Sequence, residues 1–273
     1  MIVPDNIRKC VVFLGFRIAS GEFRLAGSAF FIGKDTETET AKDVFLVTAR
    51  HVIDGIRKLG IDKVFIRANT TSGTSLWAEC ESTAWLFHPT DSSVDIALLK
   101  TGVPEGWDHL VIPFSMSATP AKMASNEVAL GDEVFIVGLF RHHHGSQKNI
   151  PIVRVGNLAA LAEEKVSASG FGMIDAYLIE ARSIGGLSGS PVFLNLGVVR
   201  YVQNAVKHST GGPIQLLLGI VHGHFDVKTS AVDDVQADAG AGLSAERVNT
   251  GRTIVVPIEK VIEAIHAYAP DAV

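Results

Sequence analysis

Short runs of apolar residues, bounded by turn-forming residues, recur along almost the whole 273-residue chain. The runs are rich in Val, Ile, Leu and Phe, and Gly, Pro, Asn, Asp or Ser separate them, which is typical of β-strands. Six such runs lie in the first half, at 10–17, 26–33, 44–49, 63–68, 76–87 and 95–100. Six more lie in the second half, at 133–140, 152–161, 174–181, 190–195, 214–225 and 252–257. Strands at this spacing predict antiparallel sandwiches or barrels, not a parallel α/β sheet.

Helical periodicity is confined to two places. Apolar residues at helical spacing predict an amphipathic helix over 258–269. Pro257 stands directly before that segment, where proline favours a helix start. A second, short helix is predicted over 52–60, directly after His51.

The spacing of the strands indicates two domains of six strands each. We expect an N-terminal domain over 8–114, a linker of small and polar residues over 115–128, and a C-terminal domain over 129–273 that includes the helix. The longest stretch without periodicity, 227–251, is predicted to be a solvated loop. A loop that lines a substrate cleft is the less favoured alternative for it.

Composition excludes several classes of protein. Hydrophobic residues make up 47% of the chain, which argues against intrinsic disorder. The net charge is only −5 and Lys and Arg are scattered, so a nucleic-acid partner is not expected. No apolar stretch reaches the ~18 residues of a membrane span, and the N-terminus does not resemble a signal peptide. The sequence therefore predicts a cytoplasmic protein without a membrane partner, and its two cysteines cannot form a disulfide framework.

A serine surrounded by glycines is the first candidate for chemistry. In GGLSGSPVF, residues 185–193, Ser188 lies among three glycines, which is more backbone freedom than a simple turn requires. A nucleophilic serine needs a base, a group that orients the base, and donors for an oxyanion. His51 follows an apolar strand in FLVTARHVI, and Asp95 begins the run DIALLK. The candidates therefore occur in the order His51, Asp95, Ser188.

These motifs in this order resemble the trypsin- and chymotrypsin-like serine peptidases, in particular bacterial trypsin-like members without disulfides. The matching segments are TA-x-H, VDIALL, G-x-SGSP, GSAFFI (27–32), LGDEVFIVG (130–138) and LGIVHG (218–223). The resemblance extends from about residue 10 to about residue 260. It implies an all-β fold of two packed six-stranded antiparallel β-barrels, with the site in the cleft between them, and the two sets of six strands agree with that.

The resemblance also implies a role for each motif residue. Ser188 would be the nucleophile, His51 the general base and then general acid, and Asp95 the residue that orients His51. The backbone N–H groups of Gly186 and Ser188 would form the oxyanion hole. Asp91 is a nearby competitor, but VDIALL fits the family pattern at Asp95. The expected function is a serine endopeptidase that hydrolyses protein or peptide substrates through an acyl-enzyme, without cofactor or metal.

The sequence departs from trypsin in two respects. Leu187 precedes the serine, where trypsin has an Asp that pairs with a new N-terminus after zymogen cleavage. No zymogen-type cleavage sequence is present either, so we expect the protein to fold in an active state. No peptide-binding module is expected after the second barrel, so proteases with appended PDZ domains are a poor overall match.

Candidate substrate-binding residues lie on two segments. Arg182 and Ser183 precede Gly186, and a cation at Arg182 would favour an acidic substrate side chain unless Arg182 points outward. His222 and His224 share one face of the LGIVHGH strand. By resemblance this strand follows the cleft, so the two rings are expected to contact substrate or to support Asp95 rather than bind metal.

Three other interpretations were compared with this one. A catalytically silent trypsin-like domain, used for binding or scaffolding, is the alternative function, because a malformed oxyanion hole leaves no trace in sequence. The nucleophile elbow of α/β-hydrolases is disfavoured, because Ser190 replaces its final glycine and the histidine comes first. The segment RHHHGSQKN, 141–149, is predicted to be a solvated hairpin and not a metal site, because it contains no carboxylate or thiol.

Overall fold

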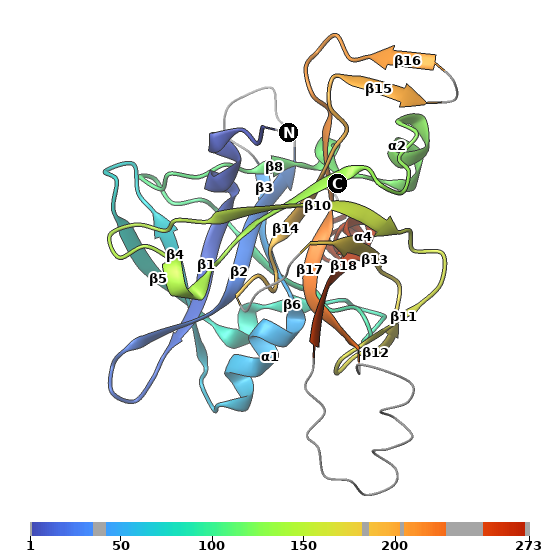
Figure 1. Ribbon diagram of the computed structural model, residues 1–273. Helices are drawn as coiled ribbons and strands as arrows, with labels where there is room; N and C mark the ends of the chain where they lie inside the picture. Colours follow the sequence, from blue (N-terminus) through green and yellow to red (C-terminus); the bar gives the residue numbers. More distant parts are fainter. Residues whose placement is uncertain (1, 35–41, 182–185, 203–204, 228–247, 271–273) are drawn as a thin grey trace, which may run out of the picture.

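The computed structural model describes residues 2–34, 42–181, 186–202, 205–227 and 248–270. Its strands form two modules that follow one another along the chain, a half-barrel from the first half and a closed barrel from the second (Figure 1). A helix follows the last strand of the closed barrel. The predicted all-β class with a C-terminal helix is therefore confirmed.

The first module is an eight-stranded sheet in the order β5-β4-β1-β2-β3-β7-β6, with β8 paired to β2. Its strands are β1 Val11–Arg17, β2 Phe23–Lys34, β3 Lys42–Thr48, β4 Lys63–Asn69, β5 Ser75–Glu81, β6 Leu86–Phe87, β7 Ala97–Thr101 and β8 Ile112–Pro113. All six predicted runs form strands, but a 3-10 turn at Ser82–Ala84 divides the run 76–87 into β5 and β6. Within the described residues β5 and β6 do not pair, so this module is a half-barrel instead of the closed barrel expected.

The second module is a closed barrel of six strands in the order β10-β13-β18-β17-β14-β9. Its strands are β9 Glu133–Gly138, β10 Ile152–Ala160, β13 Tyr177–Glu180, β14 Pro191–Asn195, β17 Gln215–Val227 and β18 Val248–Pro257. Each of them corresponds to one predicted run. Strands β17 and β18 extend into the predicted loop 227–251, where Val227 pairs with Val248. The rest of that loop, 228–247, lies outside the described residues.

Two short hairpins leave the barrel and were not predicted. They are β11 Val166–Ala168 with β12 Gly172–Ile174, and β15 Val199–Val202 with β16 Ala205–His208. Strand β16 is exposed at every position, so it has no buried face to produce an apolar alternation. The Arg200 side chain holds the second hairpin to the barrel, because its guanidinium donates to both Asp132 carboxylate oxygens at 2.8 Å.

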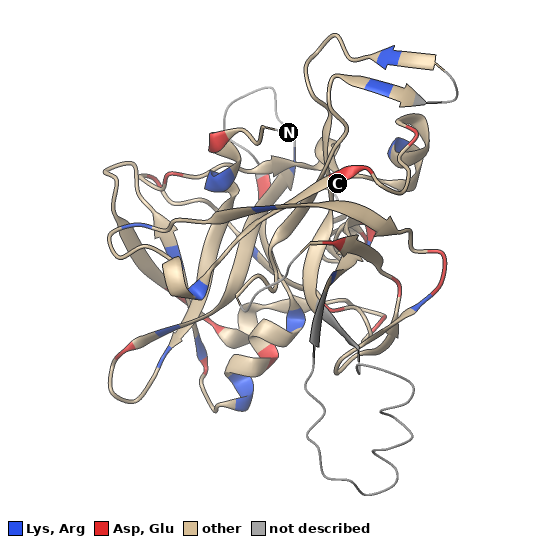
Figure 2. Ribbon diagram, viewed as in Figure 1, with Lys and Arg blue, Asp and Glu red and all other residues tan. Residues whose placement is uncertain are grey.

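The helices are α1 Arg50–Lys58, α2 Pro120–Ser125 and α4 Ile258–Tyr268, with 3-10 turns at Asp5–Cys10, Ser82–Ala84, Phe114–Met116 and Arg141–His143. Helices α1 and α4 confirm the two predicted ones. Helix α2 lies in the predicted linker, where Thr119 caps it and Pro120 is its first residue. None of the described helices has the length and apolar character needed to cross a membrane. Lys and Arg are interspersed with Asp and Glu over the ribbon (Figure 2).

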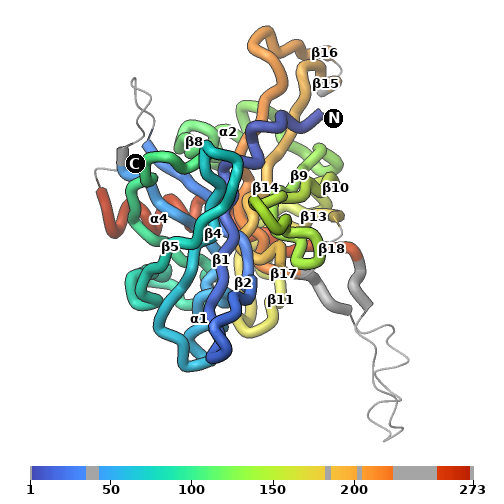
Figure 3. The backbone as a smooth tube through the Cα atoms, turned by 90° about the vertical axis from the view of Figure 1, so that its left-hand side faces the viewer, coloured from blue at the N-terminus to red at the C-terminus, as the bar shows by residue number. Residues whose placement is uncertain are grey.

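One apolar cluster contains residues from both modules and fixes them against each other. The aromatic rings Phe13, Phe30 and Phe45 of the first module are fully buried in it. Phe135 and Phe193 of the barrel belong to the same cluster and stack with ring centroids 4.9 Å apart. Strands β1 and β2 accordingly lie beside β14 and β17 when the molecule is viewed from the side (Figure 3). A shared core of this kind gives the two modules a defined relative position.

The segment 141–149 joins the modules as well, so the prediction of a solvated hairpin is only partly correct. Its 3-10 turn at Arg141–His143 is exposed, but Asn149 is buried. The Asn149 side-chain amide donates to the carbonyl of Arg67 at 2.6 Å. In return, the Asn69 side chain accepts from the Asn149 N–H at 2.6 Å and donates to its carbonyl at 3.1 Å. These bonds tie the barrel to strand β4.

We expect Asn149→Ala to lower the free energy of unfolding by about 1–3 kcal/mol, because it leaves the buried Arg67 carbonyl without its donor. Urea denaturation measures the change. Gln147→Ala is the matched control, since Gln147 is exposed and bonds β5 through its backbone carbonyl; it should change stability by less than about 0.5 kcal/mol. Equal loss in both variants would contradict this role for Asn149.

Candidate active site

His51 and Asp95 are brought together by the pairing of β3 with β7. Thr48, the last residue of β3, lies opposite Ala97, the first residue of β7. In an antiparallel pair, the residues that follow one strand are neighbours of those that precede the other. His51, in the first turn of α1, therefore lies next to Asp95.

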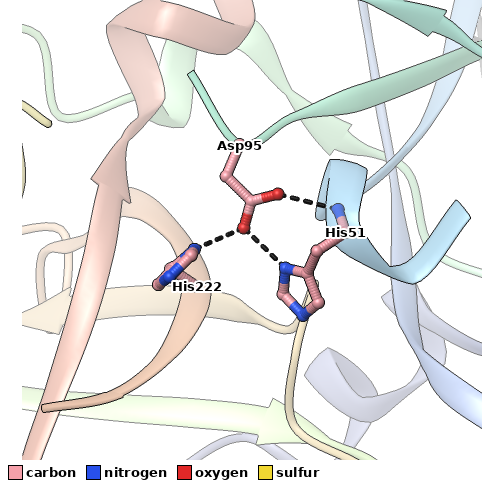
Figure 4. A group of neighbouring side chains, drawn as sticks. All are labelled: His51, Asp95 and His222. Atoms are coloured by element: carbon pink, nitrogen blue, oxygen red, sulfur yellow. Dashed lines mark hydrogen bonds and ion pairs between the residues drawn. The ribbon is translucent and has the colours of Figure 1, made fainter. Parts of the chain in front are cut away.

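Asp95 holds His51 at two points (Figure 4). Its Oδ2 atom lies 2.7 Å from His51 Nδ1, and its Oδ1 atom accepts the His51 backbone N–H at 2.9 Å. Asp95 is 0% exposed, whereas the His51 side chain is 35% exposed. One edge of the His51 ring is therefore fixed in the interior while the ring remains partly open to solvent.

A second histidine contacts the same carboxylate oxygen. His222, on β17 of the barrel, places its Nδ1 atom 2.5 Å from Asp95 Oδ2. The His222 residue is only 6% exposed. Its ring lies edge-on to the rings of His51 and Phe171, with centroids 5.4 Å away in each case. Of the two roles that the sequence left open for His222, this geometry corresponds to support of Asp95.

The hydrogen bonds from His222 and His51 keep the Asp95 carboxylate ionised. Burial alone would raise the pKa of Asp95, but the hydrogen bonds and charges of His222 and His51 outweigh it and hold the pKa well below its usual range. An ionised carboxylate only accepts hydrogen bonds, so the Nδ1 atoms of both rings carry hydrogens. The Nε2 atom of His51 is then the ring nitrogen available to accept a proton.

The competing acid, Asp91, is engaged elsewhere. Its Oδ1 atom accepts from the Ser93 hydroxyl at 2.6 Å and from the Ser93 N–H at 2.9 Å. These bonds lower the pKa of Asp91. Asp91 therefore caps its own turn, and Asp95 is the acid that contacts His51.

Ser188 lies in a tight turn that enters strand β14. The Ser190 N–H donates to the Leu187 carbonyl, and the Gly189 N–H donates to Val221 on β17, both at 2.9 Å. Gly189 has a φ of +80°. A Cβ atom at Gly189 would lie 2.3 Å from both the Ser28 carbonyl and the Thr48 hydroxyl. Only glycine fits this position, so the glycine-rich motif reflects close packing against the first module.

Ser28 of strand β2 connects the serine turn to the first module. Its N–H donates to the Ser188 carbonyl at 2.9 Å, and its hydroxyl donates to the Gly186 carbonyl at 3.1 Å. The same hydroxyl accepts the Leu139 N–H at 2.9 Å. Ser28 is fully buried, so these bonds form without competition from water. Ser28 belongs to the GSAFFI motif, but the sequence alone indicates no role for this residue.

The Ser188 hydroxyl donates to the backbone carbonyl of His222 at 3.3 Å. Within the described part of the chain, no hydrogen bond joins Ser188 to His51. His222 thus contacts Asp95 through its ring and Ser188 through its backbone. The structure therefore assembles all three predicted residues around one position of β17.

The structure describes fewer contacts for the remaining predicted site residues. Gly186 has a φ of +110° and its carbonyl is bonded to Ser28, as described above. Among the described residues, neither Gly186 nor Ser188 donates its N–H to a protein acceptor. Arg182 and Ser183 lie outside the described residues. The backbone of His224 lies in β17 opposite Thr253, and its side chain is not among the described ones.

The one potential metal-binding group among the described residues consists of His51, Asp95 and His222, whose ligand atoms lie within 4.8 Å of one another. The two nitrogen–oxygen distances are 2.7 and 2.5 Å. Tetrahedral zinc with bonds of about 2.0–2.1 Å would hold its ligands about 3.3 Å apart. The spacing is therefore that of a hydrogen-bonded network.

Comparisons with known proteins identify the family and the fold. A family model described as a trypsin-like peptidase domain matches residues 27–200. No significant match was found among curated proteins. Among solved structures, the MamO protease domain from Magnetospirillum magneticum, in its apo form, is similar with a TM-score of 0.55 and 15% identity. The similarity covers 94% of this chain and 96% of that one.

Two further solved structures share the fold. The HtrA-type protease AlgW with decapeptide has a TM-score of 0.51 and 14% identity, over 97% of this chain and 65% of that one. The Rv3671c protease in an inactive form has a TM-score of 0.50 and 16% identity, over 96% of this chain and 90% of that one. At these identities the similarities establish the fold alone.

The stability that Asp95 contributes should be lost in acid. Because the pKa of Asp95 is lowered only in the folded chain, the unfolded chain takes up a proton first as the pH falls below about 4. The free energy of unfolding should therefore fall more steeply from about pH 5 to about pH 2 in the wild type than in Asp95→Asn, whose side chain does not titrate. Urea denaturation across this range measures both slopes, and parallel slopes would contradict the assigned hydrogen bonds.

Proposed function

Because this chain belongs to the trypsin-like peptidase family, we propose that it is a serine endopeptidase with the triad His51, Asp95 and Ser188. The observation that carries the proposal is the two-point contact between Asp95 and His51, through Nδ1 and the backbone N–H. This contact fixes the tautomer in which Nε2 is free to act as a base. Proteins or peptides are the substrate class that the family implies.

The first half of the reaction forms an acyl-enzyme. The Ser188 Oγ atom attacks the carbonyl carbon of the scissile peptide bond as its proton passes to His51 Nε2. Negative charge develops on the carbonyl oxygen and is bound by the N–H groups of Gly186 and Ser188. The imidazolium of His51, stabilised by ionised Asp95, then donates its proton to the leaving amine as the peptide C–N bond breaks.

The second half releases the acyl group. Water donates a proton to His51 Nε2 and attacks the ester carbonyl of the acyl-enzyme. The second tetrahedral intermediate uses the same two N–H groups. His51 returns the proton to Ser188 Oγ as the ester bond breaks, and the enzyme is restored. Each proton is transferred by His51, so the chemistry needs no metal or cofactor.

The serine hydroxyl must turn before the first step. In the described structure it donates to the His222 carbonyl, at a long 3.3 Å. Rotation about the Cα–Cβ bond of a serine takes place on a picosecond-to-nanosecond scale in accessible side chains, and Ser188 is half-buried. The proposed reaction therefore begins with rotation of this hydroxyl toward His51.

A catalytically silent binding domain is the second candidate function. The same contact between the Ser188 hydroxyl and the His222 carbonyl favours it, because a serine held there is not activated by His51. The Rv3671c protease, which shares the fold, has likewise been solved in an inactive form. The two candidates differ in whether Ser188 becomes nucleophilic in solution.

A fluorophosphonate probe distinguishes the two functions, because it reacts only with an activated serine. We expect it to label the wild type and to fail with Ser188→Ala and His51→Ala, as read by in-gel fluorescence. Ser190→Ala is the control in the same turn, since its buried hydroxyl has no hydrogen-bond partner in the described structure; labelling should persist. Folded wild type that takes up no label would favour the binding domain, and label on Ser188→Ala would mean another nucleophile.

The orienting acid can be identified by a matched pair of variants. Asp95→Asn should slow hydrolysis of a fluorogenic peptide by about 10⁴-fold, because the amide favours the wrong tautomer of His51. Asp91→Asn should leave the rate within about threefold, because the Asp91 carboxylate bonds Ser93 in its own turn. Steady-state kinetics measures both. The reverse order of effects would assign the role to Asp91.

A further inference from the structure

The imidazole of His222 has no part in the proposed reaction, yet it makes the shortest contact with Asp95. Its Nδ1 atom lies 2.5 Å from Oδ2, the oxygen that also receives His51 Nδ1 at 2.7 Å. Both rings therefore hydrogen-bond the same carboxylate oxygen of Asp95. A residue that only filled space would not need a ring nitrogen aimed at this oxygen.

His222 also reaches the nucleophile. Its backbone carbonyl accepts the Ser188 hydroxyl at 3.3 Å, and the neighbouring Val221 carbonyl accepts the Gly189 N–H at 2.9 Å. The backbone of β17 therefore hydrogen-bonds the turn that contains Ser188. The His222 ring, which projects from the same strand, hydrogen-bonds Asp95. A shift of His222 would move the acid and the nucleophile together.

The proton on His222 Nδ1 follows from the charge of its partner. The Asp95 carboxylate accepts from His222, from the His51 ring and from the His51 N–H, so it has only acceptor roles. The Nε2 atom of His222 is then the only site on its ring that can gain a proton. Gain of that proton would turn a neutral donor into a buried cation beside Asp95.

On the basis of the proposed peptidase function, we propose that His222 is a positioning residue for the triad and an acid-sensitive brake on it. As a neutral ring it fixes Asp95 against His51. Once His222 is protonated at Nε2, its imidazolium forms an ion pair with the single negative charge of Asp95. His51 then has less negative charge to stabilise its own imidazolium, which must form in each transition state.

Among the side chains that the structure describes, few others could compensate this charge. The groups that its ring faces are Asp95, the His51 ring and the uncharged Phe171 ring. Strand β18 presents Val255 and Ile254 at the register positions beside it. Asp91, Asp175 and Lys260 line a small cavity together with Asp95 and are the other charged residues that line it. Two imidazolium rings would therefore share the one carboxylate that they both contact.

Two variants of His222 separate the effect of its hydrogen-bond donor from the effect of its positive charge. His222→Asn keeps an amide nitrogen the same number of bonds from the backbone as Nδ1, so it can donate to Asp95 but cannot become charged. His222→Phe keeps a ring and removes the donor. We expect the kcat of the Asn variant at neutral pH to exceed that of the Phe variant, because the Asn variant keeps a donor to Asp95. The Phe variant should lose about 10²-fold in kcat with little change in KM, because Asp95 loses its alignment.

The acid limb of the kcat profile tests the brake. In the wild type, the limiting slope of log kcat against pH should lie between 1 and 2, because protonation of His51 removes the base and protonation of His222 further slows the reaction. In His222→Asn the slope should approach 1. A slope of 1 in both proteins, or of 2 in both, would overturn the brake. Equal kcat in the wild type and the Phe variant would overturn the positioning role.

A measurement without substrate keeps this proposal distinct from the peptidase function. Proton NMR of the protein with ¹⁵N-labelled histidine should show two strongly deshielded ring N–H signals in the wild type and one in His222→Asn. A single signal in the wild type would overturn the proposed hydrogen bond. Two signals in a protein that fails to hydrolyse peptides would overturn the peptidase function, and with it the brake, while the hydrogen bond itself would stand.

Discussion

The site depends on the hydrogen bonds that stabilise the buried carboxylate of Asp95. A charge without solvent exposure is stable only when hydrogen-bond donors replace the water it has lost. Asp95 obtains two donors from His51 in the first module and one from His222 in the second. Within the described residues, the donors to this charge therefore come from both modules. The burial of this charge and the proposed function thus require the same arrangement of the two modules.

The contact between the modules also fixes the turn that carries Ser188. Fully buried Ser28 bonds the Ser188 and Gly186 carbonyls, and Gly189 packs where no Cβ atom would fit. The shared aromatic core and the Asn149 bonds hold the same contact elsewhere along the boundary. Residues from distant parts of the chain consequently meet with little freedom to separate, which is the preorganisation that acyl transfer requires.

Much of the fold could be predicted because its strands are amphipathic or buried and are separated by strong turn formers. The twelve predicted runs all contain strands, and both predicted helices are present. Strands without a buried face, such as β16, lack that signal. Helix α2 carried a capping threonine and a first-turn proline that could have indicated it within the predicted linker. Closure of the first barrel depends on whether β5 and β6 meet, which local pattern does not encode.

The candidate site was predictable in part for a different reason. The motifs gave the order His51, Asp95, Ser188 and the family resemblance gave each residue a role, and the structure assembles these residues around β17. The contact between His222 and Asp95 joins residues that are 127 positions apart. No sequence periodicity reports such a contact, so its geometry had to come from the structure. The role of Ser28 was missed for the same reason, since both of its side-chain partners lie in the other module.

The most direct test of the account is a crystal structure of the protein with a peptide boronic acid, which forms a stable tetrahedral adduct with an activated serine. The account predicts boron bonded to Ser188 Oγ, one boronate oxygen within hydrogen-bonding distance of the Gly186 and Ser188 N–H groups, and His51 Nε2 beside the adduct. The Asp95 carboxylate should remain bonded to both imidazole rings. Boron bonded to another residue, or a free Ser188 hydroxyl still donating to the His222 carbonyl at saturating inhibitor, would contradict it.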